Sequence, residues 1–128
     1  MAGEQILVVD DNSSNLVLTE FLLKAAGYSV VCAVSAIEGL EKLKAGGFRL
    51  VLMDIEMPGM DGLVATRLIK ADPRLAPVRV VALTAYAMAG DHERCLEAGC
   101  AGYISKPIDT RSFAQSVGQY LKTSGSNP

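Results

Sequence analysis

The sequence predicts an α/β fold with a doubly wound, five-stranded parallel sheet. Five short apolar runs rich in β-branched residues recur along the chain, and each precedes a stretch with helix signals. The run from Leu50 to Met53 is apolar at every position, which is typical of a strand in a sheet covered by helices on both faces. Acidic residues follow two of the runs directly, as expected where parallel strands end at a ligand site. Together these observations indicate a central parallel sheet built from β/α units.

The strands and helices can be assigned in chain order. The five predicted strands are Gln5 to Val9, Ser29 to Ala33, Leu50 to Met53, Val78 to Leu83 and Ala101 to Ile104. Polar side chains from Asn12 to Ser14 favour the start of the first helix there, and Gly27 favours its end. Gly46 and Gly47 end the second helix, and the loop from Asp72 to Pro77 separates the third helix from the fourth strand.

The first helix is apolar on more than one side, so two faces compete for contact with the sheet. We expect one face to pack on the sheet; its residues are Val17, Leu18, Phe21, Leu22 and Ala25. Leu16 and Leu23 fall on the opposite face and are expected to be exposed. They are either ordinary surface leucines or an apolar strip at which a partner docks.

Length and composition limit the class of protein. The 128 residues fit one domain, residues 1–128, with a core from about 5 to 121 and a flexible tail from 122 to 128. The formal net charge of -2 and the lack of a basic cluster argue against nucleic-acid binding. No apolar stretch suits a membrane span or a signal peptide, so we expect a cytoplasmic protein. Cys32, Cys95 and Cys100 are expected to be small buried hydrophobes without a disulfide.

Polar residues follow four of the five predicted strands. Asp10 and Asp11 follow the first strand and Asp54 the third, whereas Thr84 and Lys106 follow the fourth and the fifth. Because the carboxyl ends of parallel strands meet at one edge of a sheet, these side chains are expected to converge. Three carboxylates that close repel one another, which favours a cation among them. Mg²⁺ suits such a site, since it binds one or two carboxylates together with phosphate oxygens.

A magnesium site of this kind suits phosphoryl transfer to a carboxylate. If Asp11 and Asp54 bind the ion directly and Asp10 acts through water, one oxygen of Asp54 remains free to attack phosphorus and form an aspartyl phosphate. Lys106 and Thr84 can neutralise and hydrogen-bond the phosphoryl oxygens. Each residue alone has an ordinary explanation as a helix cap, a strand-end hydroxyl or a surface charge, whereas the combination favours the chemical one.

These residues, in this order, resemble the receiver domain of two-component response regulators. The resemblance covers the chain from Ile6 to about Leu121. It rests on four motifs: Val8-Val9-Asp10-Asp11-Asn12, Leu52-Met53-Asp54-Ile55-Glu56-Met57-Pro58-Gly59-Met60-Asp61-Gly62, Leu83-Thr84-Ala85 and Ser105-Lys106-Pro107. It implies a flavodoxin-like sheet in the strand order 2-1-3-4-5 with five helices. The segments from Ala82 to Met88 and from Ala98 to Tyr103 are similar to receivers of hybrid sensor kinases and of free-standing regulators of the bacterial cell cycle.

The resemblance implies roles for the acidic residues. Asp54 would be the phosphoacceptor, Asp10 and Asp11 would form the acidic pocket that holds Mg²⁺, and Glu56 would lend its backbone carbonyl to the metal. Glu56 and Tyr86 flank the site, and we expect them to tune the lifetime of the phosphate, in a direction that the sequence leaves open.

The resemblance also implies a switch. Thr84 would be the switch hydroxyl that moves toward the phosphoryl group, and Tyr103 would be the switch aromatic whose ring turns inward. Lys106 would pair with the phosphate, and its peptide bond to Pro107 is expected to be cis. The surface around the fourth helix, the fifth strand and the fifth helix would then change between two states.

The implied partners are proteins. A histidine kinase or a histidine phosphotransfer protein would donate the phosphoryl group, and a kinase helix bearing the donor histidine would dock at Leu16 and Leu23 if these are exposed. We expect residues 122–128 to be too few for a DNA-binding output domain, and we therefore expect the chain to signal to a downstream protein effector or to pass the phosphate onward. The expected catalysis is limited to the domain's own phosphorylation and dephosphorylation, so we do not expect an enzyme.

Two other functions share parts of the pattern. An aspartyl-phosphate phosphatase of the haloacid-dehalogenase kind would need Asp-x-Asp on the first strand, whereas Asp10 is followed by Asp11 and Asn12. A flavin-binding module would need a phosphate-cradling loop rich in Ser, Thr and Gly, and the two acids would repel that phosphate. The single histidine, His92, is expected to be an exposed surface residue, which argues against a hydrolase triad.

Overall fold

The protein is built on one sheet of five parallel strands. The computed structural model describes residues 4–57, 59–85, 89–106 and 108–123. The strands are β1 (Gln5–Val9), β2 (Ser29–Ala33), β3 (Phe48–Asp54), β4 (Arg79–Thr84) and β5 (Gly102–Ser105). Their order in the sheet is β2-β1-β3-β4-β5, which confirms the expected topology. β3 begins earlier than predicted, at Phe48, and runs through Asp54.

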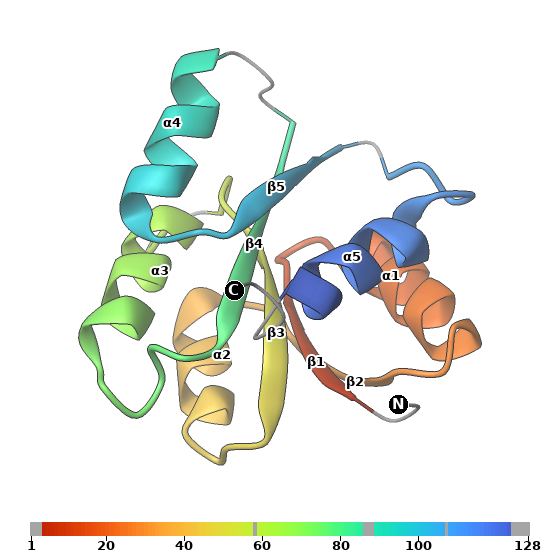
Figure 1. Ribbon diagram of the computed structural model, residues 1–128, viewed down its shortest axis with the longest axis horizontal. Coiled ribbons are helices and arrows are strands. Elements are labelled where there is room, and N and C mark those ends of the chain that lie inside the picture. Colours follow the sequence, from red (N-terminus) through yellow and green to blue (C-terminus); the bar gives the residue numbers. More distant parts are fainter. Residues whose placement is uncertain (1–3, 58, 86–88, 107, 124–128) are drawn as a thin grey trace.

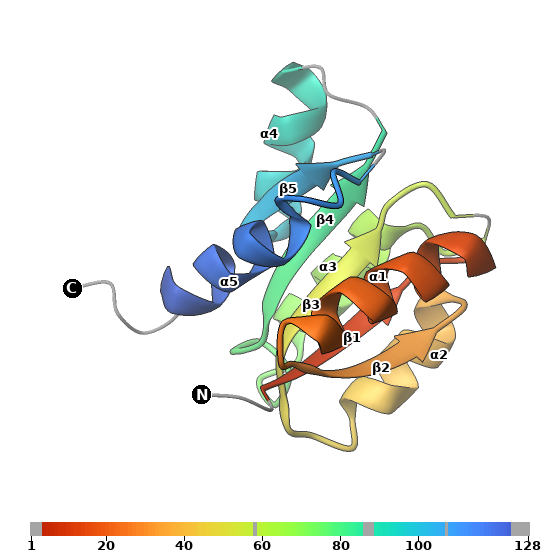
Figure 2. The same cartoon turned by 90° about the vertical axis from the view of Figure 1, so that its right-hand side faces the viewer.

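Five helices cover both faces of the sheet (Figure 1). They are α1 (Ser13–Ala25), α2 (Ala36–Leu43), α3 (Gly62–Ala71), α4 (Ala89–Ala98) and α5 (Phe113–Thr123). Two perpendicular views show α1 and α5 on one face and α2, α3 and α4 on the other (Figure 1 and Figure 2). α5 runs two residues past the predicted end of the core at 121, and residues 124–128 of the predicted tail lie outside the described part of the chain.

Alternate residues of the central strands point into two separate cores. Leu7 and Val9 of β1 join the core beneath α2, α3 and α4, whereas Ile6 and Val8 join the core beneath α1 and α5. All four side chains are fully buried. A strand whose two faces both lie in a core has no position for a solvated side chain, which explains why the strand sequences are apolar at every position.

The register of the strands sets the edge at which the site forms. Val9, the last residue of β1, lies beside Met53, so Asp10 emerges level with the end of β3. Asp54 lies beside Leu83, and Thr84 follows at the end of β4. The carboxyl ends of β1, β3 and β4 therefore place their polar residues along one edge of the sheet.

Short polar caps and glycines begin and end the helices. Asn12 caps α1, and its side-chain oxygen accepts a hydrogen bond from the backbone N–H of Asn15 at 3.0 Å. Ser35 caps α2 and Asp61 caps α3 in the same way. After α1 the chain turns at Gly27, whose φ of 99° is a left-handed conformation that favours glycine. Of the candidate caps from Asn12 to Ser14, Asn12 is therefore the one that the helix uses.

The orientation of α1 differs from the prediction. Leu16, Thr19 and Leu23 are its buried residues, whereas Val17 and Phe21 are 67% and 68% exposed. The predicted exposure of Leu16 and Leu23, and a partner strip formed by them, are therefore wrong. Apolar residues lie on several sides of this helix, so its pattern does not define one face. Thr19 can join the buried face because its hydroxyl donates to the carbonyl four residues earlier, at 2.8 Å.

The cysteines behave as small hydrophobic residues. Cys95 and Cys100 are buried as predicted, whereas Cys32 is only half-buried, and none of the three forms a disulfide. Burial raises the pKa of the Cys100 thiol to about 11, which keeps it protonated and unreactive at neutral pH. Within the described ranges, no helix combines the length and the hydropathy needed to cross a bilayer.

We expect Gly62→Ala to destabilise the domain. A Cβ at Gly62 would meet the carbonyl oxygen of Asp54 and lie 2.8 Å from the Cα of Ile55. Because these are backbone atoms, the start of α3 has to move, at a cost of about 1–3 kcal/mol. Gly90→Ala is the matched control, since no atom lies within 4 Å of the added Cβ in α4, and alanine there should be neutral or stabilising by up to about 1 kcal/mol. Urea unfolding followed by circular dichroism compares the two, and equal stabilities would contradict the packing argument.

Candidate functional site

Three carboxylates meet at the carboxyl edge of the sheet. Asp10 and Asp11 directly follow β1, and Asp54 is the last residue of β3. One oxygen from each carboxylate lies within 4.8 Å of the other two. Asp10 and Asp54 are buried, whereas Asp11 is exposed. The three acids thus lie together, as their positions at the strand ends predict, and the cluster faces solvent at Asp11.

The crowding of charge is most evident at Asp10. Its Oδ1 accepts a hydrogen bond from the backbone N–H of Asn12 at 2.9 Å, but its buried Oδ2 has no hydrogen-bond partner among the residues that the structure describes. Burial raises the pKa of Asp10 to about 6; the Asn12 hydrogen bond works in the opposite direction, and the charge of Asp54 adds to the rise. The Asp10 carboxylate is therefore poorly stabilised unless a proton or a cation joins it.

Lys106 places a positive charge against this cluster. Its Nζ lies 2.9 Å from Oδ1 of Asp54 and 3.9 Å from Oδ2 of Asp10, the second distance being too long for a hydrogen bond. Burial opposes the ammonium charge, but the hydrogen bond to Asp54 and the charges of Asp54, Asp10 and Glu56 raise the pKa of Lys106 above its ordinary value. One ammonium facing three carboxylates leaves the cluster with a net negative charge.

The side chain of Glu56 reaches from the loop after β3 to the end of β4. Thr84 is buried there, and its Oγ1 donates a hydrogen bond to Oε2 of Glu56 at 2.6 Å. The backbone N–H of Ala85 lies 3.2 and 3.3 Å from the two carboxylate oxygens of Glu56. The backbone N–H of Glu56 donates to Oδ1 of Asp54 at 3.0 Å. The sequence predicts a role for the backbone carbonyl of Glu56 and for its position beside the site, but not these contacts of its carboxylate.

Tyr103 of β5 stacks on His92 of α4. The ring centroids are 3.7 Å apart and the ring planes are inclined by 20°. Both side chains are half-buried, so the predicted exposure of His92 is wrong. In the described part of the chain, Nε2 of His92 is buried without a hydrogen-bond partner. The ring of Tyr103 is therefore held against α4 by an aromatic contact.

The predicted site residues are not all placed by the structure. Five of them lie at the carboxyl edge of the sheet: Asp10, Asp11, Asp54, Thr84 and Lys106. Tyr103 lies on the neighbouring strand β5. Tyr86 and Pro107 lie outside the described residues, and so does the peptide bond that is expected to be cis.

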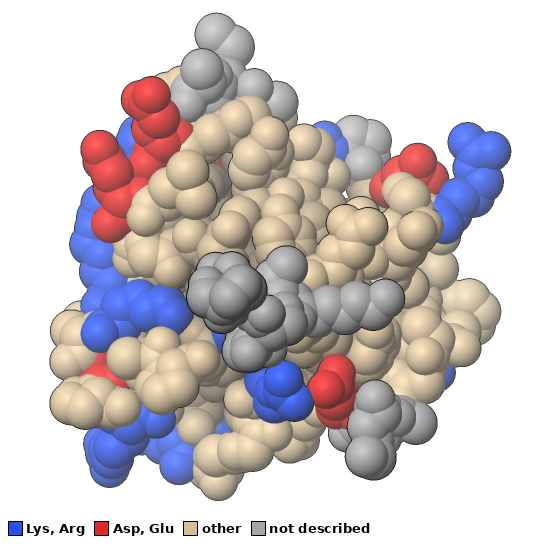
Figure 3. Space-filling model, viewed as in Figure 1, with Lys and Arg blue, Asp and Glu red and all other residues tan. Residues whose placement is uncertain are grey.

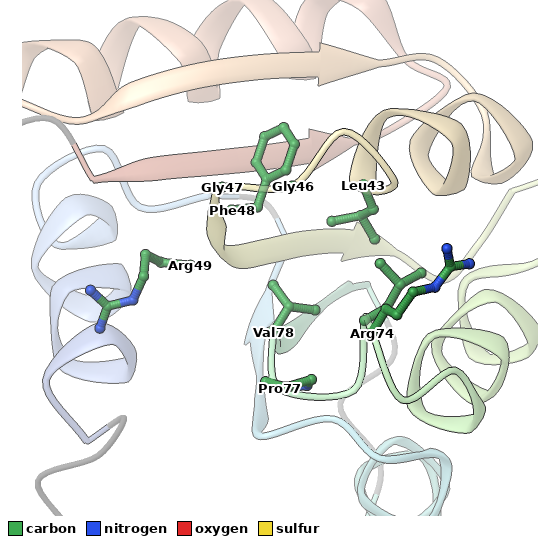
Figure 4. A pocket seen from close by; sticks show the side chains of 9 residues that line it. Leu43, Gly46, Gly47, Phe48, Arg49, Arg74, Pro77 and Val78 are labelled. Carbon is green, nitrogen blue, oxygen red and sulfur yellow. The ribbon is translucent and has the colours of Figure 1, made fainter.

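A separate hollow of about 250 Å³ lies at the opposite edge of the sheet (Figure 4). It is lined at the amino ends of the strands, where Phe48 and Arg49 begin β3 and Val78 precedes β4. Arg49 forms an ion pair with Glu4, with 3.0 Å between Nη1 and Oε2. At the other side of the hollow, Arg74 forms an ion pair with Asp72, with 3.4 Å between Nη2 and Oδ2. None of the described lining residues belongs to the acidic cluster, so the hollow is not part of this site.

Comparison with known proteins gives a consistent result. The family model of the response regulator receiver domain matches residues 6–118. The polar-differentiation response regulator DivK of Brucella ovis is 38% identical over 118 residues, which cover 92% of this chain and 96% of the relative. DivK of Brucella anthropi is 37% identical over the same length.

Two solved structures of receiver domains are similar to this chain both in fold and in sequence. A CheY-like response regulator receiver domain protein from Methanospirillum hungatei has a TM-score of 0.87 at 30% identity, with 99% of this chain and 100% of that chain covered. The receiver domain of the sensor histidine kinase PA1611 from Pseudomonas aeruginosa has a TM-score of 0.85 at 34% identity, with 94% and 99% covered, and that structure holds a magnesium ion in its active site cleft. None of these relatives supports a phosphatase or a flavin-binding function. The chain belongs to the response regulator receiver domain family.

Proposed function

We propose that this receiver domain accepts a phosphoryl group on Asp54 as part of a two-component phosphorelay. The supporting observation is the setting of Asp54, which is buried at the end of β3 beside two further acids and 2.9 Å from the ammonium of Lys106. This setting offers an anionic nucleophile, acids for a metal ion and a cation for the incoming phosphate.

A Mg²⁺ ion fits the acidic cluster. The buried Oδ2 of Asp10 has no hydrogen bond within the described ranges, and the cluster reaches solvent at Asp11, so the ion can keep some of its waters. The proposed ligands are the carboxylates of Asp10, Asp11 and Asp54 and the backbone carbonyl of Glu56. The magnesium in the PA1611 receiver supports this assignment. A bound Mg²⁺ would neutralise the carboxylates and the charge that develops on the phosphoryl oxygens.

The transfer needs little more than positioning. An oxygen of Asp54 forms the new bond to phosphorus while the bond from phosphorus to the donor breaks, and the donor leaves with the electron pair. Lys106 and the N–H of Glu56 both contact Oδ1 of Asp54, so they fix the orientation of the carboxylate. Lys106 then pairs with one phosphoryl oxygen, and the hydroxyl of Thr84 donates to another.

The added phosphate acts on a switch formed by Thr84 and Tyr103. A phosphoryl group adds about -1.5 to -2 charge and three acceptor oxygens. Thr84 would turn from Glu56 toward these oxygens. Tyr103, which lies beside Ala82 of β4 in the sheet, would then leave its stack with His92. This change biases the surface of α4, β5 and α5 between two states.

The proposed partners are a histidine kinase or a histidine phosphotransfer protein as donor and a downstream protein effector. Figure 3 shows a face on which the region over β5 and α5 is largely uncharged, with acidic and basic side chains both present around it. Such a surface suits a protein better than a nucleic acid, which needs a basic patch. We further propose that the protein acts in the cytoplasm as a single domain with a core of about 5–121. The domain would catalyse only its own phosphorylation and dephosphorylation.

The phosphoacceptor can be identified by mass. Incubation with acetyl phosphate and Mg²⁺ should add one phosphoryl group to the intact protein, and hydroxylamine, which cleaves acyl phosphates, should remove it. Asp54→Asn should abolish the addition, because a neutral amide lacks the anionic oxygen that attacks phosphorus. Asp72→Asn is the matched control, since Asp72 lies in the loop after α3 at the other end of the sheet, and it should be labelled like the wild type. Undiminished labelling of Asp54→Asn would rule out this acceptor.

Asp10→Asn should stabilise the metal-free domain at neutral pH. Because the pKa of Asp10 rises from 3.8 to about 6 on folding, the folded state binds the proton more tightly than the unfolded chain does. The carboxylate therefore opposes folding above about pH 6, and this effect fades as the pH falls toward 4. In EDTA near pH 7 the variant should gain about 1–3 kcal/mol, or several degrees in Tm, and near pH 4 it should match the wild type.

Addition of Mg²⁺ gives the complementary measurement. The ion should raise the Tm of the wild type more than that of Asp10→Asn, because the variant lacks one ligand charge. Thermal unfolding followed by circular dichroism gives the Tm of both proteins near pH 7 and near pH 4, in EDTA and in Mg²⁺. Equal responses of the two proteins to pH and to Mg²⁺ would show that the charge of Asp10 neither opposes folding nor contributes to metal binding.

A further inference from the structure

The carboxylate of Glu56 is surrounded by hydrogen-bond donors and positive charge. It accepts a hydrogen bond from the hydroxyl of Thr84 at 2.6 Å, and the backbone N–H of Ala85 donates to its two oxygens at 3.2 and 3.3 Å. The ammonium of Lys106 lies 3.8 Å from its Oε1. A hydroxyl, a backbone N–H and an ammonium are also the groups that stabilise a bound phosphoryl group.

Two of these groups, Thr84 and Lys106, are the ones that the proposed function assigns to the phosphoryl oxygens. The Thr84 hydroxyl has one proton, so it cannot donate to Glu56 and to a phosphoryl oxygen at the same time. A phosphoryl group on Asp54 would also place its negative charge beside the Glu56 carboxylate, and like charges at this distance repel. The two anions therefore compete for the hydroxyl of Thr84, and both lie in the field of Lys106, which is 3.8 Å from Glu56 and makes no hydrogen bond to it.

We propose that Glu56 is an internal competitor of the phosphoryl group, whose carboxylate holds the hydroxyl of Thr84 in the resting domain and must release it when Asp54 is phosphorylated. The inference rests on the proposed function, which supplies the acceptor and the role of Thr84. Glu56 thereby slows phosphorylation and holds Thr84 in its resting position. This assigns to Glu56 an effect on the rate of phosphorylation, in addition to the predicted effect on the lifetime of the phosphate.

The competition can be separated from a purely structural role. If Glu56 only supported the loop after β3, its removal would disturb Thr84 and Asp54 and would slow phosphorylation. If it competes, its removal exposes the donors and speeds phosphorylation. Substitution changes only the side chain, so the backbone carbonyl proposed as a metal ligand and the N–H bond to Asp54 are retained.

The first measurement is the rate of phosphorylation by acetyl phosphate with saturating Mg²⁺, followed by intact mass. Glu56→Ala should be phosphorylated about three- to tenfold faster than the wild type, which corresponds to the net value of about one hydrogen bond of ordinary strength. Glu56→Gln should fall between the two, because it keeps an acceptor for Thr84 but loses the charge. Glu41→Ala is the matched control, since it removes one negative charge from an exposed position of α2 and should behave as the wild type.

The second measurement uses beryllofluoride, which mimics a phosphoryl group without covalent transfer. Its affinity, measured by titration calorimetry, should rise in the same order, with Glu56→Ala tighter than Glu56→Gln and both tighter than the wild type. If the alanine variant folds poorly, the glutamine variant provides the same comparison.

The outcomes distinguish this inference from the proposed function. Labelling of Glu56→Ala at or below the wild-type rate, with beryllofluoride affinity unchanged or weaker, would overturn the competition while Asp54 remains the acceptor. Failure of every variant and of the wild type to label would instead overturn the acceptor assignment, and the competition with it.

Discussion

The structure depends on holding three carboxylates together against their mutual repulsion. Asp10 and Asp54 cannot move apart, because the register of β1 and β3 fixes their positions and both strands are buried between two apolar cores, and Asp11 follows Asp10 directly in the chain. Lys106 offsets part of the charge, chiefly through its 2.9 Å contact with Asp54. The packing of the sheet thus holds together a site whose negative charge is only partly neutralised. Binding of a cation or a proton there is therefore favourable.

Much of the fold could be predicted because the strand sequences record their surroundings directly. A strand between two layers of helices must be apolar at every position, so the runs around Ile6 and Leu52 identify both the strands and the doubly covered sheet. The convergence of Asp10 and Asp54 follows from parallel strands ending at one edge. The strand order itself came from the family resemblance, since hydrophobic patterns alone do not specify which strands are neighbours.

Other features depend on tertiary contacts that a linear pattern does not contain. The buried face of α1 differs from the predicted one because apolar residues surround the helix, and because a threonine, Thr19, is buried together with the leucines. The carboxylate of Glu56 meets Thr84 although the two are 28 residues apart in sequence. Only the position of Glu56 shortly after a strand-ending aspartate hinted at this. The contact of His92 with Tyr103 likewise joins a helix and a strand that the sequence treats separately.

The stack of His92 on Tyr103 has a practical consequence. His92 is the only histidine in the chain, so its imidazole resonances in a proton NMR spectrum are assigned without mutagenesis. They lie above an aromatic ring at a centroid distance of 3.7 Å, where ring-current shifts are large. The protein therefore contains its own spectroscopic reporter, and any departure of the tyrosine ring from α4 becomes visible as a chemical-shift change in an otherwise unlabelled sample.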